Sequence, residues 1–140
     1  MDAEDSPLWD AYRRTTFQVD TPAGVVTIRI DESSAEVDVL LRRNDAKEWA
    51  FITAYNPASE VLLPEENQRR HTQLESDVRT RGLVCLQGKG ITADPGWLPE
   101  TSLLILNLTR YAAVELGAKD GQNAIVHGKF RQAAELVDCR

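Results

Sequence analysis

The chain has 140 residues, of which 42% are hydrophobic and 27% are charged, as is typical of a globular domain. We expect a single domain over residues 1–140 with a disordered tail at residues 1–5, because this length supports one core. The net charge of −6 argues against nucleic acid as a partner. No membrane-length apolar run and no signal peptide is visible, so we expect a cytoplasmic protein without a membrane partner.

Cysteine and histidine are too sparse to predict a metal site. Cys85 and Cys139 are far apart, with no CxxC spacing, and His71 and His127 lack the HxxxH spacing of a metal-binding helix. We therefore predict no metal site. The sequence identifies no cofactor and leaves the oligomeric state open.

The first elements are a short helix and a hairpin. Ser6 followed by proline is typical of a helix start, and this helix is expected to reach about Arg14. Two strands, at residues 15–20 and 24–30, alternate as half-buried antiparallel strands do. A capping box at residues 33–36 then opens a helix ending near Arg43.

Segment 49–57 predicts the central strand of the sheet. Odd-numbered and even-numbered positions from Trp49 to Tyr55 form two separate faces, and both are apolar, so the strand is expected to be covered on both sides. Pro57 cannot donate a ladder hydrogen bond and ends the strand at Asn56. Open α/β sheets usually place their sites where such a strand ends.

The longest helix is predicted over residues 64–81, from a proline at its first position to Gly82 just past its end. Its inward stripe is aliphatic in the C-terminal half and polar in the N-terminal half, with Asn67, His71, Leu74 and Val78 on the stripe and Arg70 beside it. Buried polar side chains need partners or a cleft. We expect them near Asn56.

Further strands are expected at residues 83–87, closing at Gly88–Gly90, and at 101–108, a second strand with two apolar faces. Loop 91–99 separates them. Thr109 caps a helix ending near Gly117, segment 122–127 is a strand, and segment 133–137 is either a strand or a helical turn. The fold class is α/β or α+β: one mixed sheet of about six or seven strands with helices on both faces. The strand order cannot be derived.

Several segments in this order resemble a bacterial family known as domain of unknown function 3293. They are Ala-Tyr-Arg at 11–13, Trp-Ala-Phe-Ile-Thr-Ala-Tyr-Asn-Pro at 49–57, Glu-Asn-x-x-Arg at 66–70, Trp-x-x-Glu-x-Ser-Leu-Leu-Ile at 97–105 and Gly-Gln-Asn-Ala-Ile-Val at 121–126. The resemblance covers roughly residues 10–137. It implies a compact bacterial domain and supplies no activity.

Amides, a guanidinium and a carboxylate stand at the predicted element ends, and the imidazole of His71 lies on the inward stripe of the longest helix. The candidate ligand-binding residues are Asn56, Asn67, Arg70, His71, Gln122 and Asn123, and the candidate catalytic residue is Glu100. One interpretation is a cleft for a small polar or anionic metabolite, nucleotide-like molecules included, held by the Arg70 fork and the amides. Whether the protein is an enzyme stays open, because Glu100 can act as a general acid or base only if desolvation outweighs a nearby cation such as Arg70.

The alternative interpretation is a non-catalytic protein-interaction module. In it, Asn56 forms an Asx-turn, Arg70 pairs with Glu100, and the polar cluster is structural. This alternative predicts an exposed apolar patch around Trp97 or Trp9. A loop tryptophan such as Trp97 either stacks on a ligand or covers a sheet edge.

Overall fold

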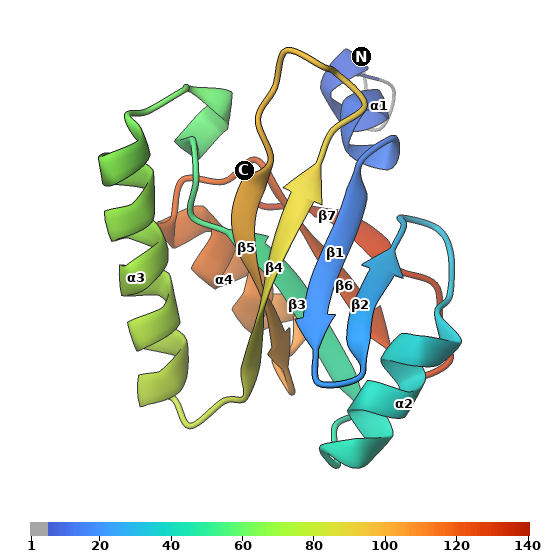
Figure 1. The fold of residues 1–140 in the computed structure, drawn as a ribbon. Helices are drawn as coiled ribbons and strands as arrows, with labels where there is room; N and C mark the ends of the chain where they lie inside the picture. Colours follow the sequence, from blue (N-terminus) through green and yellow to red (C-terminus); the bar gives the residue numbers. More distant parts are fainter. Residues whose placement is uncertain (1–5) are drawn as a thin grey trace.

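The strands form one curled sheet, which the computed structural model describes within residues 6–140; the expected tail at 1–5 lies outside the described residues. The strands are β1 (Thr16–Thr21), β2 (Gly24–Ile28), β3 (Glu48–Thr53), β4 (Cys85–Ile91), β5 (Glu100–Leu106), β6 (Ala124–Lys129) and β7 (Glu135–Asp138). Their order is β2-β1-β4-β5-β3-β6-β7, with antiparallel neighbours (Figure 1). A parallel bridge between Ile30 and Ala134 links the two edges of the sheet.

Four α-helices flank the sheet in the described part of the chain: α1 (Pro7–Arg13), α2 (Ala35–Arg43), α3 (Pro64–Thr80) and α4 (Arg110–Lys119). A short 3-10 turn, η2 (Pro57–Ser59), follows β3. Figure 1 shows α3 and α4 on one side of the sheet and α2 on the other. The predicted fold class, one sheet of six or seven strands with helices on both faces, is confirmed. The sheet was expected to be mixed, but its neighbouring strands all pair antiparallel in the described residues. None of the helices in residues 6–140 is long and apolar enough to cross a bilayer.

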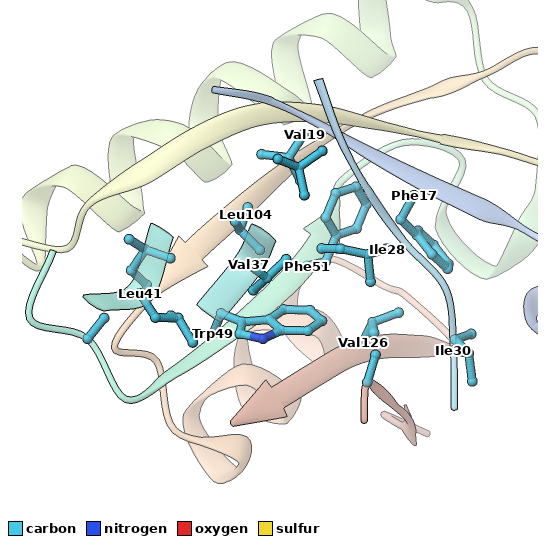
Figure 2. Packing of buried hydrophobic residues seen from close by; sticks show 14 residues of the cluster. Phe17, Val19, Ile28, Ile30, Val37, Leu41, Trp49, Phe51, Leu104 and Val126 are labelled. Atoms are coloured by element: carbon cyan, nitrogen blue, oxygen red, sulfur yellow. The ribbon is translucent and has the colours of Figure 1, made fainter. Parts of the chain in front are cut away.

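The sheet separates two apolar cores. Trp49 and Phe51 of β3 belong to the inner core, which the curl of the sheet encloses and α2 covers, as Figure 2 shows. Ala50 and Ile52 belong to the outer core, under α3 and α4. The predicted alternation of β3 between two buried faces is therefore confirmed, and each core contains residues from both central strands.

Side-chain caps begin three of the helices. Ser6 Oγ accepts from the Trp9 amide at 3.1 Å, and Thr109 Oγ1 accepts from Ala112 at 3.2 Å. In α2 the cap is Ser34, whose Oγ accepts from Val37 N at 3.2 Å. The predicted capping box at residues 33–36 is therefore wrong: the second serine of the pair is the cap, and the third helical position then holds Val37, which cannot complete a box.

The strand predicted at residues 83–87 has both ends misplaced, because β4 begins at Cys85 and ends at Ile91. β4 continues through Gly88 and Gly90 to Ile91. A Cβ at Gly88 would lie 2.5 Å from Gln18 O and 2.9 Å from the Phe51 ring. The glycine thus marks a close approach within the sheet rather than a turn.

The C-terminal elements also differ from expectation. α4 runs past Gly117 to Lys119, because Gly117 makes room for Ile125 and Cys139 instead of ending the helix. The segment left open at 133–137 contains a strand, since β7 pairs antiparallel with β6.

Candidate functional site

A cavity of about 260 Å³ lies on the inner face, at the end of the sheet where β3 ends and β5 begins. The inner positions there carry small side chains: Thr53, Gly90, Ser102 and Ala124. Thr53 pairs with Ser102 in the β3–β5 ladder, one inner step beyond Phe51 and Leu104. The cavity begins where the inner side chains become too small to fill the curl.

The wall of the cavity is mostly carbon, and α1 contributes Leu8, Ala11 and Tyr12 to it. Phe17 and Phe51 also line it and meet edge to face, with ring centroids 5.2 Å apart. Within the described residues, no lysine, arginine or histidine lines this cavity, whereas Asp94 and Glu100 do. The charged groups of the lining are therefore carboxylates.

Asn56 connects the cavity to α3. Its Oδ1 accepts from Leu62 N at 3.0 Å and from Asn67 Nδ2 at 2.8 Å, and Asn67 Oδ1 accepts from Asn56 N at 2.9 Å. Two donors on the oxygen fix the orientation of the Asn56 amide. Its Nδ2 consequently donates to Glu100 Oε2 at 2.8 Å.

Glu100 is a half-buried carboxylate at the cavity. Burial raises the pKa of the Glu100 carboxyl above its usual value, while hydrogen bonds from Asn56 and Trp97 act in the opposite direction. Both donors are neutral. No ion pair to Glu100 is formed within residues 6–140.

Arg70 does not pair with Glu100, so the structural alternative from the sequence is wrong on this point. Its Nε donates to Ala54 O at 3.1 Å and its Nη2 to Asp120 O at 3.0 Å. Arg70 does not line the cavity. It ties the end of β3 to the end of α4.

Gln122 lines the cavity, and its Nε2 donates to Tyr55 O at 3.0 Å. Asn123 does not line the cavity itself. Its Nδ2 donates to Ser59 Oγ, a lining residue, at 3.3 Å. Burial raises the pKa of the Tyr12 hydroxyl, against hydrogen bonds with Asn123 and Ser59. The C-terminal amides thus support the cavity wall beside α1.

Asn67 and His71 occupy the predicted inward stripe of α3, at 5% and 3% exposure. Asn67 supports Asn56, as described, but His71 faces away from the cavity. Its Nε2 lies 2.9 Å from Gln87 Oε1, and its Nδ1 is buried with no hydrogen-bond partner in the described part of the chain. No group of three or more His, Cys, Asp or Glu side chains within residues 6–140 could hold a metal ion.

The structure thus brings Asn56, Glu100 and Gln122 to the cavity and leaves the other predicted residues behind it or outside it. Sequence reasoning missed Tyr12 and Ser59. Tyr12 does lie in the Ala-Tyr-Arg segment of the family resemblance, which was a usable signal. Ser59 had none, because its side chain contacts Asn123, which is distant in sequence.

The family model described as protein of unknown function (DUF3293) matches residues 52–125. This range includes Asn56, Asn67, Glu100 and Gln122 and leaves α1 outside. No curated protein and no solved structure matches the chain. Because the matched range covers more than half of the 140 residues, the chain belongs to the family described as protein of unknown function (DUF3293).

Proposed function

We propose that the protein binds a small molecule in the cavity beside Glu100. The observation that carries the proposal is the combination of an apolar cavity with a carboxylate that Asn56 holds in a fixed position. Pockets for small ligands have this composition, and their volumes begin at about 300 Å³, close to the volume here. The ligand is therefore small.

The backbone beside the cavity also supports the proposal. Asn56, Ala58 and Ser59 have φ angles of 47°, 53° and 62°, in the left-handed region that non-glycine residues rarely adopt. The amide of Ala58 donates to Gly121 O at 2.8 Å, which anchors this turn. Such conformations cost roughly 1–3 kcal/mol each and cluster at functional sites.

The charges of the lining favour a neutral or cationic ligand. The sequence suggested a polar or anionic metabolite, nucleotide-like molecules included, because Arg70 could have held an anion. Arg70 instead donates its hydrogen bonds to the backbone carbonyls of Ala54 and Asp120, and the charged side chains that line the cavity are Asp94 and Glu100. A carboxylate or phosphate in the cavity would face like charge.

The protein-interaction alternative has less support. Trp9, one of the two tryptophans expected in an exposed apolar patch, is only 3% exposed. The other, Trp97, lines the cavity. An interaction module remains a distinct hypothesis, and it predicts self-association or a protein partner without any small ligand.

Acid–base catalysis by Glu100 is a second candidate function, favoured by its raised pKa, since an acid or base that works near neutral pH needs such a shift. Carbon-13 NMR of the carboxyl groups tests it. A Glu100 pKa at or below about 4.3, the unperturbed value, would contradict this role. We further propose a cytoplasmic location in a bacterium, which rests on the family resemblance.

Thermal unfolding against a panel of amines, amino acids, alcohols, sugar phosphates and nucleotides tests the binding proposal. A ligand at a hundred times its Kd stabilises the fold by about 2.7 kcal/mol, which raises the midpoint by several degrees. Ala124→Leu fills the cavity without removing a side-chain hydrogen bond, and Ala118→Leu on the exposed side of α4 is the matched control. The proposal requires a shift in wild type and Ala118→Leu that Ala124→Leu loses. No shift with any compound, or a shift that Ala124→Leu retains, contradicts it.

A further inference from the structure

We propose that the ligand of the cavity carries a protonated amine, for which Glu100 is the counter-ion. This inference rests on the proposed function above and deepens it by assigning the class of ligand. It depends on three features of the cavity: the neutral donors at Glu100, the aromatic rings of the wall and the distribution of charge.

Glu100 has donors but no cation. Asn56 Nδ2 lies 2.8 Å from Oε2, and Trp97 supplies a second hydrogen bond. Neutral donors stabilise a carboxylate but leave its charge uncompensated, and a partly desolvated charge without a partner is unfavourable. A cation that enters the cavity supplies the missing charge.

Aromatic rings surround the space that the cation would enter. Tyr12, Phe17, Phe51 and Trp97 all line the cavity. The face of an aromatic ring attracts ammonium groups, more strongly where water is excluded. The carbon of the wall suits the apolar body of a small alkyl or aryl amine.

Other charge types fit less well. An anionic ligand would meet Glu100 and Asp94, with no cationic side chain of the described residues in the lining. A neutral alcohol can donate to Glu100 but does not balance its charge. The net charge of −6 also attracts cations over anions at long range.

The titratable groups that line the cavity with Glu100 are Tyr12 of α1 and Asp94 of the β4–β5 loop. The raised pKa of Tyr12 keeps its hydroxyl neutral near pH 7, and Asp94 is exposed. The remaining polar neighbours, Asn56 and Trp97, do not titrate. Binding of an amine therefore favours the ionised form of Glu100 and lowers the pKa of its carboxyl group.

Benzylamine, benzyl alcohol and benzoate test the inference, since they share a shape and differ in charge. Calorimetric titration of the whole chain at pH 7 is expected to give benzylamine at least about tenfold tighter binding than benzyl alcohol, with benzoate weakest. Carbon-13 NMR of the carboxyl groups is expected to show a lower Glu100 pKa with benzylamine bound than in the free protein. Glu100→Gln is expected to abolish the amine preference.

Equal or tighter binding of the alcohol or of benzoate overturns the inference, and so does failure of benzylamine to bind. The proposed function survives these outcomes if another compound of the thermal panel shifts wild type but not Ala124→Leu. If Glu100→Gln does not fold, Glu100→Asp replaces it and is expected to keep the amine first in the series with weaker binding. The wild-type ligand series decides the matter without any variant.

Discussion

At the scale of single residues, Asn56 connects the fold to the cavity. Its backbone amide and both polar atoms of its side chain are each bonded to a named partner, and Asn67 accounts for two of these bonds. The positive φ of Asn56 suits asparagine better than most residues. Its position at the end of β3 therefore depends on a buried residue of the neighbouring helix.

Asn67→Ala is expected to destabilise the protein by about 2–3 kcal/mol, because it leaves polar groups of Asn56 without partners. Urea unfolding measures the change. Gln68→Ala, at the next and exposed position of α3, is the control and is expected to change stability by less than about 0.5 kcal/mol. Similar effects for the two variants would mean that the Asn56–Asn67 pair contributes little.

Asp120 is a second residue whose environment opposes its charge. Burial raises its pKa to about 6, and its Oδ2 has no hydrogen-bond partner within residues 6–140. Because the pKa is raised on folding, its contribution to stability is complete below about pH 4 and is lost as pH rises through about 6.

Asp120→Asn is therefore expected to stabilise the fold at pH 7.5, by about 1 kcal/mol after allowance for partial exposure. The gain should disappear at pH 4, where the wild-type carboxyl is protonated in the folded state. Thermal unfolding of both proteins across this range measures it. A gain that does not change with pH would contradict the assignment to Asp120 ionisation.

The stability of Glu100→Gln distinguishes a ligand-binding role of Glu100 from a purely structural role. Because the pKa of Glu100 is raised on folding, the contribution of its carboxyl group to the free energy of unfolding falls as pH rises. Glutamine at this position keeps an oxygen that can accept the hydrogen bond from Asn56 Nδ2. At pH 8 we expect an equal or higher midpoint than wild type in thermal unfolding. A large loss of stability would indicate that the charge of Glu100 holds the fold together, as the structural alternative requires.

At the scale of elements, the glycines of β4 shape the sheet above the inner core. Gly88 lies against Gln18 O and the Phe51 ring, so β4 can pass where a side chain would collide. Phe51 belongs to both the inner core and the cavity wall. The strand therefore positions an aromatic ring that the proposed site uses.

Gly88→Ala is expected to destabilise the fold by at least about 1–3 kcal/mol, because its Cβ would collide with backbone and ring. Gly96→Ala is the matched control: its Cβ would meet only Asp94 Oδ1, at 3.4 Å. Denaturant unfolding compares the two variants. Equal stabilities would show that β4 shifts easily and that Gly88 has no special role.

The elements were predictable where the signal is local. Ser6, Thr109 and Gly82 marked helix ends, and the two-faced strands were recognised by their alternation. The continuation of β4 beyond Gln87 was not recognised, because the need for Gly88 comes from Phe51, which is distant in sequence. A glycine that accommodates a remote ring has the same sequence signature as a turn glycine.

At the scale of the whole molecule, the curl of the sheet creates the cavity. Ile30 and Ala134 link the sheet edges, and α1 lies over one end of the inner face (Figure 1). Segments from both ends of the chain therefore contribute to one wall. Tyr12 and Asn123 meet there although they are far apart in sequence.

The candidate site was predictable only in part for the same reason. The end of β3 and the inward stripe of α3 placed Asn56, Asn67 and Glu100 together. The partners of Arg70 depend on where α4 ends, which requires the strand order. Without that order, an arginine beside a carboxylate was a reasonable but wrong structural interpretation.

The indole N–H resonance of Trp97 tests the central claim most directly. Trp97 lines the cavity and hydrogen-bonds to Glu100, whereas Trp9 and Trp49 are buried outside the cavity lining and serve as internal controls in the same spectrum. The indole resonance that is missing from the spectrum of Trp97→Phe is the resonance of Trp97. The ligand found by thermal shift is expected to move the Trp97 resonance and leave the other two unchanged. A Trp97 resonance that does not move at saturating ligand would contradict a binding site beside Glu100.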